Sequence, residues 1–186
     1  MNPHLILFTL TAALAMPAAY AVEYRTVVPQ QSAIQFEFRQ MGVPVKGGFK
    51  RFATQMRFDP AKPEAASAQV EIDLASIDAG SPEANDESAS RLWFNRSVYP
   101  KATFVSSQVR ALGNNRYEMR GSLTLKGRSR EVVVPVTYLP GKNVATFDGS
   151  FVLKRLDFGI GEGMWADVAT VANEVQVRFR IAATGS

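Results

Sequence analysis

Cysteine is absent from the 186-residue chain, and His4 is its only histidine. Without cysteine there can be no disulfide, iron–sulfur cluster, thiolate zinc site or thiol nucleophile. Any core must therefore be held by burial alone. An excess of one charge sign is also missing, because 21 Lys and Arg face 17 Asp and Glu, for a formal net charge of +4. This excess is too small to indicate a nucleic-acid partner, and we expect none.

The first 21 residues have the pattern of a secretory signal peptide. An apolar run from Leu5 to Met16 precedes the helix-breaking Pro17 and the small residues of Ala19-Tyr20-Ala21. This pattern predicts cleavage after Ala21. The run is shorter than the roughly 20 residues that span a bilayer, which disfavours a membrane anchor. We therefore expect a signal peptide over residues 1–21 and one exported domain over residues 22–186.

Cleavage would also remove His4 and leave a domain without histidine or cysteine. Ser-His-Asp and Cys-His catalysis, haem ligation by histidine and the common zinc sites are then excluded. The chain has no Gly-x-Ser-x-Gly, Ser-x-x-Lys, P-loop or Asp-x-Asp-x-Asp-Gly motif. A carboxylate pair, a carboxylate calcium site and a lysine-based mechanism remain open.

The exported domain alternates apolar and polar residues with the period of two that is typical of half-buried strands. The clearest alternating stretches are residues 34–38, 70–74, 117–125, 132–138, 145–153 and 175–183. Turn-forming residues at 113–115, 126–128 and 140–143 predict antiparallel hairpins between successive strands.

One segment departs from this alternation. Ser81 is a good N-cap, Pro82 suits the first helical position and Glu83 suits the positive end of a helix dipole. These residues predict a short helix from Pro82 to about Leu92. It is the only helix that we expect after the signal peptide.

Antiparallel strands with one apolar face form either a sandwich or a closed barrel. We favour an all-β, antiparallel, lipocalin-like barrel with one short helix inserted between strands, because closure removes exposed edges. Gly121 and Gly149 also fall on the inward register, where a strand bends sharply or a ligand approaches. Most phenylalanines lie on that register, so we expect an uncharged interior that either forms a filled core or holds an apolar guest.

Short stretches across the whole exported domain occur in a characteristic order and spacing. They are Ser32–Phe36, Gln40–Gly42, Lys46–Phe49, Val70–Ile77, Trp93–Asn95, Tyr99–Phe104, Gly121–Gly127 and Leu153–Gly161. In these stretches the chain resembles the YceI-like family of polyisoprenoid-binding proteins. The resemblance implies a lipocalin-like barrel, exported to the bacterial periplasm, that encloses a long isoprenoid or another amphiphilic lipid.

The chain differs from the family pattern at two places. The family often carries one histidine where this chain has Gln40, and another in the helical segment near Asn85, Asp86 and Glu87. If those histidines contact a polar head group in relatives, Gln40 and Glu87 are the nearest substitutes. We therefore expect a head group different from that of the histidine-bearing members.

The glycine-rich segment 157–169 does not match a dinucleotide fingerprint, because Met164 stands where the third glycine is required and no helix pattern follows. It is either a rim whose Ile160 and Trp165 cap a cavity mouth or a surface loop anchored by its tryptophan. Asp157, Glu162 and Asp167 are most simply solvated turn residues.

These observations predict a periplasmic binding or carrier protein for a long apolar lipid such as a polyisoprenoid, an isoprenoid quinone or a fatty amide. We expect no catalytic residue, metal or cofactor. Mouth positions are assigned to Gln40, Glu87 and Trp165. The expected lining residues are Phe36, Phe38, Phe49, Phe104, Met119, Leu123, Val134, Phe147, Phe151 and Phe179.

Two other functions and two further partners stay open. Alternation also fits a small outer-membrane barrel with its apolar face toward lipid, and a carboxylate pair would suit a hydrolase. Basic residues are concentrated in 110–130, whereas residues 64–90 carry acids and no Lys or Arg. This asymmetry is compatible with transient contact with an anionic membrane surface or with two solvated faces. A homodimer is also compatible with the sequence.

Overall fold

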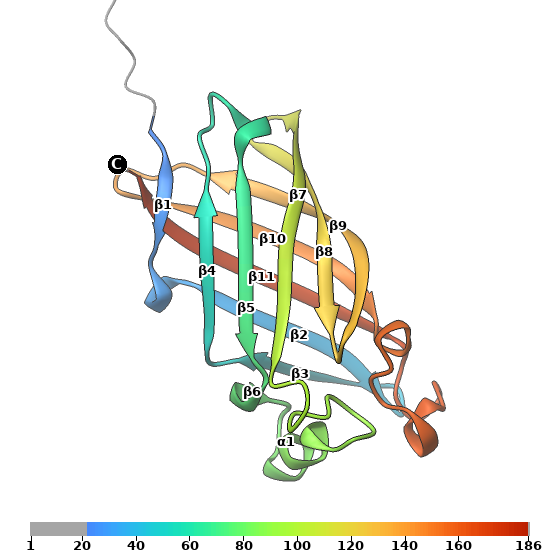
Figure 1. Ribbon diagram of the computed structural model, residues 1–186. Helices are drawn as coiled ribbons and strands as arrows, with labels where there is room; N and C mark the ends of the chain where they lie inside the picture. Colours follow the sequence, from blue (N-terminus) through green and yellow to red (C-terminus); the bar gives the residue numbers. More distant parts are fainter. Residues whose placement is uncertain (1–21, 186) are drawn as a thin grey trace, which may run out of the picture.

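Figure 1 shows the computed structural model, which describes residues 22–185. The predicted signal peptide, residues 1–21, lies outside the described residues. The signal peptide and its cleavage after Ala21 therefore stay predictions. Residues 22–185 form one 11-stranded antiparallel sheet with one α-helix and five short 3-10 turns. No helix within this range is both long and apolar enough to cross a membrane.

The elements follow the chain in this order. The strands are β1 (Tyr24–Val27), β2 (Ala33–Gln40), β3 (Val43–Phe49), β4 (Phe52–Arg57), β5 (Ser67–Asp73), β6 (Ile77–Asp78), β7 (Lys101–Gly113), β8 (Arg116–Leu125), β9 (Arg128–Leu139), β10 (Val144–Lys154) and β11 (Glu174–Gly185). The helical elements are η1 (Pro29–Gln31), η2 (Pro63–Ala65), η3 (Leu74–Ser76), α1 (Pro82–Ala89), η4 (Arg155–Phe158) and η5 (Gly163–Ala166).

All three predicted hairpins are present, joining β7 to β8, β8 to β9 and β9 to β10. The alternating stretches correspond to β2, β5, β8, β9, β10 and β11. The alternating stretches do not include β1, β3, β4, β6 or β7. β3 contains Pro44, Gly47 and Gly48, and the register of β7 shifts between Ser106 and Gln108. Such a shift breaks the period of two.

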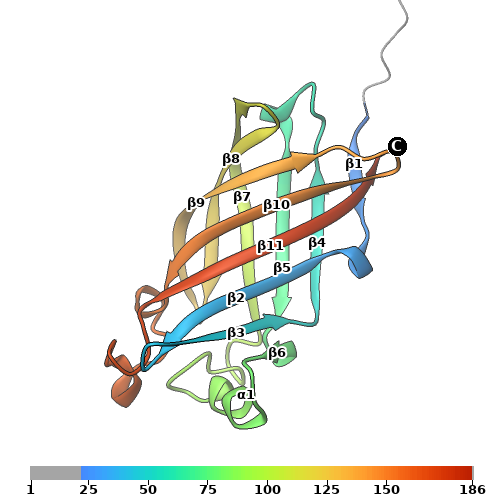
Figure 2. The ribbon, with the colours of Figure 1, turned by 180° about the vertical axis from the view of Figure 1, so that it is seen from behind.

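The sheet has the strand order β4-β5-β7-β8-β9-β10-β11-β2-β3-β6 and curls into a half-barrel. From behind, β9, β10, β11, β2 and β3 cross the other wall obliquely (Figure 2). Its two sides come together through β1, which pairs with β11 and also exchanges backbone hydrogen bonds of 2.8 and 3.1 Å between Tyr24 and Phe58. The expected antiparallel, lipocalin-like architecture with one inserted helix is therefore confirmed.

The helix begins as predicted but ends earlier. The Ser81 hydroxyl accepts a hydrogen bond from the Ala84 amide at 3.2 Å, as an N-cap does. The last helical residue is Ala89 rather than a residue near Leu92, because Ser90 adopts an extended backbone and its amide donates to the Glu87 carbonyl. The following segment, residues 90–99, then folds across the same end of the barrel.

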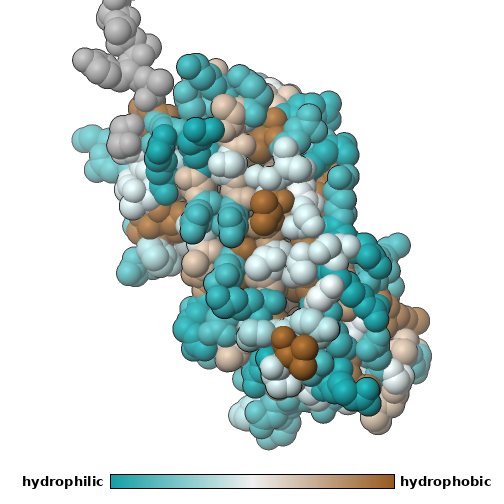
Figure 3. Space-filling view, in the orientation of Figure 1, coloured by the Kyte–Doolittle hydropathy of each residue, from teal (hydrophilic) through white to brown (hydrophobic). Residues whose placement is uncertain are grey.

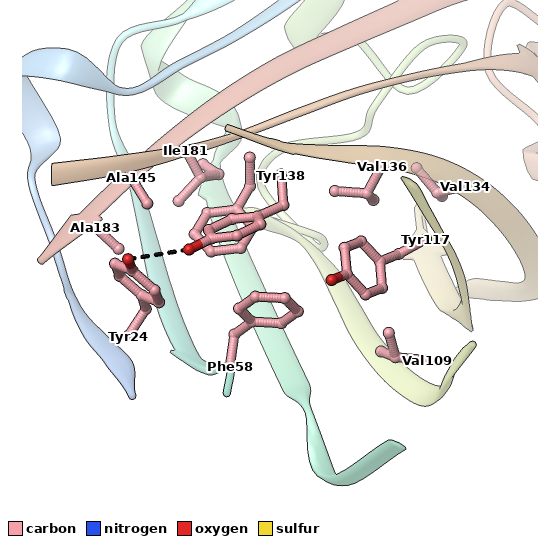
Figure 4. Packing of buried hydrophobic residues seen from close by; sticks show 11 residues of the cluster. Tyr24, Phe58, Val109, Tyr117, Val134, Val136, Tyr138, Ala145, Ile181 and Ala183 are labelled. Atoms are coloured by element: carbon pink, nitrogen blue, oxygen red, sulfur yellow. Dashed lines mark hydrogen bonds between the residues drawn. The ribbon is translucent and has the colours of Figure 1, made fainter. Parts of the chain in front are cut away.

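An aromatic cluster fills the interior near β1 (Figure 4). The Tyr138 hydroxyl donates to the Tyr24 hydroxyl at 3.0 Å, and the rings of Phe58 and Phe147 meet edge to face with centroids 5.0 Å apart. Burial raises the pKa of Tyr138 and of Tyr117, so both phenols stay neutral. We call Tyr24, Phe58, Tyr117, Tyr138 and Phe147 the aromatic plug, which closes this end of the barrel.

Gly121 and Gly149 each lie against an aromatic ring. A Cβ atom on Gly149 would overlap the ring of Phe179, its direct cross-strand partner, and one on Gly121 would overlap the ring of Phe104. Each glycine therefore makes room for a phenylalanine ring of the neighbouring strand. Gly121 also pairs with Ser106, where the register of the β7–β8 pairing shifts.

Candidate functional site

A cavity of about 690 Å³ lies inside the half-barrel, between the aromatic plug and the end that carries α1. This volume falls within the range that is usual for small-molecule sites. Phe58, Tyr117 and Phe147 of the plug form its floor, whereas Trp93 and Trp165 line its other end. The interior is thus filled at one end only.

Every residue assigned to the lining or the mouth lies on the cavity wall. These residues are Phe36, Phe38, Gln40, Phe49, Glu87, Phe104, Met119, Leu123, Val134, Phe147, Phe151, Trp165 and Phe179. Contact of these side chains with a ligand stays a prediction.

Strand register explains why apolar side chains collect inside. Phe36 pairs with Gly47 and Val177, and its ring lies 5.5 Å from that of Phe49 between centroids. The outward neighbours are charged, as shown by Arg178 and Glu37, which form an ion pair at 3.6 Å. Figure 3 accordingly shows an outer surface that is mostly hydrophilic. The apolar register therefore faces the cavity and the polar register faces solvent.

The interior is not free of charge, contrary to expectation. Arg57, Glu83, Glu87 and Arg155 also line the cavity, and the side chain of Arg155 is 2% exposed. The alternation could have placed Arg155 inside, because Arg155 comes two positions after Leu153 and therefore shares the inward register of Phe151 and Leu153. The predicted series ends at the strand terminus and therefore omits it.

Arg155 organises the segment that follows β10, which we call the rim loop (residues 155–172). Its Nε, Nη1 and Nη2 atoms donate, at 2.6–3.1 Å, to five backbone carbonyls, those of Ala172, Ile160, Gly161, Trp165 and Val171. No carboxylate among residues 22–185 forms an ion pair with it by the geometry of the structure. Burial lowers the pKa of the guanidinium. A single buried cation thus fixes the rim loop.

Glu162 gives the rim loop a second attachment, so it is not a solvated turn residue as expected. Its carboxylate accepts from Lys126 Nζ and from Arg128 Nη2, both at 3.0 Å. Lys126 Nζ also donates to the Gly159 carbonyl at 2.5 Å. The hydrogen bond from Lys126 and the two positive charges lower the pKa of Glu162. The β8–β9 turn therefore holds the rim loop from outside.

Two of the predicted mouth residues bind each other. Trp165 Nε1 donates to Glu87 Oε1 at 3.0 Å, which links the rim loop to α1. Gln40 pairs with Val171 of the same rim loop through a backbone bridge. Ile160, expected to cap the mouth, is 4% exposed and lines the cavity. The rim interpretation of this segment therefore describes the structure better than a free surface loop does.

Two carboxylates line the cavity: that of Glu87, which was assigned to the mouth, and that of Glu83, which was not expected there. Glu83 is exposed, and hydrogen bonds from its own amide and from the Ser81 hydroxyl lower its pKa. Glu87 accepts from Trp165 and from the Ser90 hydroxyl. An acid catalyst requires a raised pKa, so Glu83 is unsuited to that role and Glu87 is engaged in holding the mouth.

Sequence comparison relates nearly the whole chain to one family. The model of the YceI-like domain matches residues 26–183. A UPF0312 protein of Azotobacter vinelandii is 30% identical over 175 residues, covering 90% of this chain and 88% of that protein. A UPF0312 protein of Vibrio cholerae is 30% identical over 190 residues, covering 95% of this chain and 100% of that protein.

Solved structures agree with this relation. The crystal structure of Burkholderia cenocepacia BcnA superposes with a TM-score of 0.83 at 44% identity, covering 85% of this chain and 99% of that one. A structure described as a polyisoprenoid binding domain from Saccharophagus degradans has a TM-score of 0.68 at 14% identity, with coverage of 89% and 99%, and shares the fold. The match over residues 26–183 shows that the chain belongs to the YceI-like family.

Proposed function

We propose that the protein is a periplasmic binding protein that carries a long apolar lipid in its cavity and has no chemistry of its own. The class of guest comprises polyisoprenoids, isoprenoid quinones and fatty amides. The observation that carries this proposal is the cavity of about 690 Å³, whose wall is built mostly from apolar side chains.

The energetics of such a site suit a long hydrocarbon. Burial of apolar surface contributes roughly 0.8 kcal/mol for each CH₂ group. Five buried carbons therefore contribute roughly 4 kcal/mol before the cost of ordering the guest. Chain length is then selected coarsely, and head-group selection depends on the few polar atoms of the wall.

The Saccharophagus degradans domain supports the choice of an isoprenoid guest, because that protein, which shares the fold, is described as polyisoprenoid binding. The arrangement of side chains argues against the outer-membrane alternative, which requires apolar residues outside and a polar lumen. Outward pairs such as Arg180 and Asp148, 2.7 Å apart, have the opposite arrangement.

A substitution that fills the cavity tests the proposal. Val177 lines the cavity, whereas Val152 is 53% exposed on the neighbouring strand. We expect Val177→Trp to lower the amount of co-purifying lipid at least tenfold, and Val152→Trp to leave it unchanged. Native mass spectrometry followed by solvent extraction measures both. Wild-type protein that carries no lipid and binds no long-chain isoprenoid or fatty amide would refute the proposal.

Fractionation of the cells that produce the protein tests whether it is exported to the periplasm. We expect osmotic shock without detergent to release the protein, with an N-terminus at Val22. Retention in the cytoplasm, or an intact N-terminus at Met1, would contradict a periplasmic location.

We also propose that guests are exchanged at a membrane surface, through the exposed apolar residues beside the mouth. Met41 and Met164 are 72% and 76% exposed. The Met41 amide donates a hydrogen bond to the Thr170 carbonyl of the rim loop. In the basic region Arg120 and Arg128 pair with glutamates, whereas Arg116 and Arg130 form no ion pair with residues 22–185, so transient contact with an anionic membrane surface stays part of this proposal. Flotation with anionic and neutral vesicles measures the contact, and sedimentation tests whether a homodimer forms.

A further inference from the structure

The wall of the cavity is interrupted between β9 and β10. Whereas β10 pairs with β11 along its whole length, its pairing with β9 ends at Gly149 and Val136. If the register continued, Ser150 would face Pro135, and proline has no amide N–H to donate to a neighbouring strand. Beyond that point β9 pairs only with β8. We call the two stretches that do not pair with each other the seam: residues 128–135 of β9 and residues 150–154 of β10.

Side chains, rather than strand pairing, close the wall along the seam. Val134 of β9 and both Phe151 and Leu153 of β10 line the cavity. Val132, Phe151 and Leu153 all pack against the buried apolar cluster that contains Phe158. Such apolar contacts have no preferred direction, so the hydrocarbon chain of a lipid can replace them as it passes between the two strands.

The end of the seam at the rim loop is also held by side chains alone. Lys126 Nζ and Arg128 Nη2, at the β8–β9 turn, both donate to Glu162 at 3.0 Å. Lys126 Nζ donates to the Gly159 carbonyl as well. No backbone hydrogen bond within residues 22–185 joins this turn to the rim loop. We call Lys126, Arg128 and Glu162 the latch, and none of these three residues lines the cavity.

The rim loop is attached to its other neighbours by backbone hydrogen bonds. The amides of Gly161 and Glu162 both donate to the Leu92 carbonyl, in the segment after α1, at 2.9 Å. Two further bonds of 2.9 Å join the loop to β2 and the β2–β3 turn, from Met41 to Thr170 and from Ala172 to Arg39. Moving the rim loop away from α1 or from β2 would therefore break backbone hydrogen bonds, whereas parting the seam would break only side-chain contacts.

We infer that the guest enters and leaves the cavity laterally, through the seam, and that the latch is the contact that opens. The inference rests on the proposed function, since it gives the route of the same guest. Met164 follows Glu162 by two residues, so the latch lies beside the surface proposed above to contact the membrane. A lipid that leaves the membrane there reaches the cavity along an apolar path.

A cross-link across the seam tests the route. The chain has no cysteine, so an introduced pair is unique. Val133 and Val152 are 41% and 53% exposed and would face each other if the register continued. A short bis-maleimide that joins Val133→Cys to Val152→Cys should slow both uptake and release about tenfold, relative to the same variant before cross-linking. The probe is all-trans-retinol, a fluorescent isoprenoid alcohol, and a cyclodextrin accepts it on release.

The matched control lies on the paired part of the same two strands. Leu139 and Thr146 are direct cross-strand partners. The same reagent on Leu139→Cys with Thr146→Cys should change neither rate by more than about twofold, because these positions are already held by the ladder.

The latch is tested without a cross-link. Because Glu162 does not line the cavity, Glu162→Gln should speed uptake and release equally, by about two- to fivefold, and leave the retinol Kd within about twofold. Glu71→Gln, which removes an exposed ion pair of 2.7 Å with Lys101, is the control and should change neither rate.

The outcomes separate the route from the carrier function. If the wild type binds neither retinol nor any other long-chain isoprenoid or fatty amide, the carrier function fails. If it binds retinol and the cross-linked seam exchanges it at the original rates, the carrier function stands and the seam is not the route. Equal slowing by the two cross-links, or a changed Kd with unchanged rates in Glu162→Gln, would also overturn the inference.

Discussion

The two ends of the barrel interior are closed by different physical means. At the β1 end, the aromatic plug fills the space with rings, and its polar atoms are neutral phenols such as those of Tyr24 and Tyr138. At the α1 end, a buried cation, Arg155, holds the rim loop through backbone carbonyls, and the cavity extends to this end. Close-packed rings leave no room for a guest, whereas a loop fixed by hydrogen bonds closes an end without filling the space below it.

The largest effect on stability is expected when Arg155, which holds the rim loop at the α1 end, is replaced. Arg155→Met should lower the free energy of unfolding by about 4 kcal/mol, because it leaves several buried carbonyls without donors. Urea unfolding measures this change, and hydrogen exchange should show the largest loss of protection in the rim loop. A loss below about 1 kcal/mol would mean that the carbonyls readily find other partners.

The second largest effect on stability is expected for a substitution in the aromatic plug. Phe58 is 5% exposed and contacts four other rings, those of Tyr24, Tyr117, Tyr138 and Phe147. Phe58→Ala should cost about 3 kcal/mol through the hole that it leaves. It should also deepen the cavity, so that the variant accepts longer guests in a competition among isoprenoid alcohols. Unchanged chain-length selection would show that the plug does not form the floor.

A smaller effect is expected for the phenol pair. Tyr138→Phe removes the hydrogen bond to Tyr24 and keeps the ring, so it should cost about 1 kcal/mol. Lipid affinity should not change, because Tyr138 does not line the cavity. Thermal unfolding and a binding titration on the same sample check the two parts, and weakened binding would contradict the separation of the two ends.

The smallest effect concerns the outer attachment of the rim loop and depends on pH. The folded pKa of Glu162 is below its ordinary value of 4.5. Its stabilisation is therefore complete above that value and is lost as the pH falls through the folded pKa. Glu162→Gln should therefore be slightly less stable than the wild type at neutral pH, and the difference should vanish as the pH falls through the folded pKa of Glu162. Identical acid unfolding curves for both proteins would exclude a role for this attachment.

Much of the fold could be predicted because its signals are local. The period of two placed Phe36, Phe151 and Phe179 on the inner face, and positive φ angles at Asn114 and Asn115 fit the turn expected between β7 and β8. Alternation could not identify β3 or β7, since glycines and a register shift interrupt the period.

The polar part of the site was less accessible to sequence reasoning. Glu87 and Trp165 were both assigned to the mouth, but their hydrogen bond joins residues 78 positions apart. Residue type does not reveal that Arg155 is satisfied by carbonyls alone, or that Nε1 of Trp93 is buried without an acceptor among residues 22–185. Those facts depend on which backbone groups of distant segments arrive beside each side chain.

Local signals in the chain are enough to specify an antiparallel sheet with an apolar inner face, because alternation, turns and the helix cap act over a few residues. That the interior is filled at one end and hollow at the other follows from the three-dimensional arrangement alone. Packing of rings from β1, β9 and β10, and the binding of rim-loop carbonyls to Arg155, depend on contacts that form after the sheet curls.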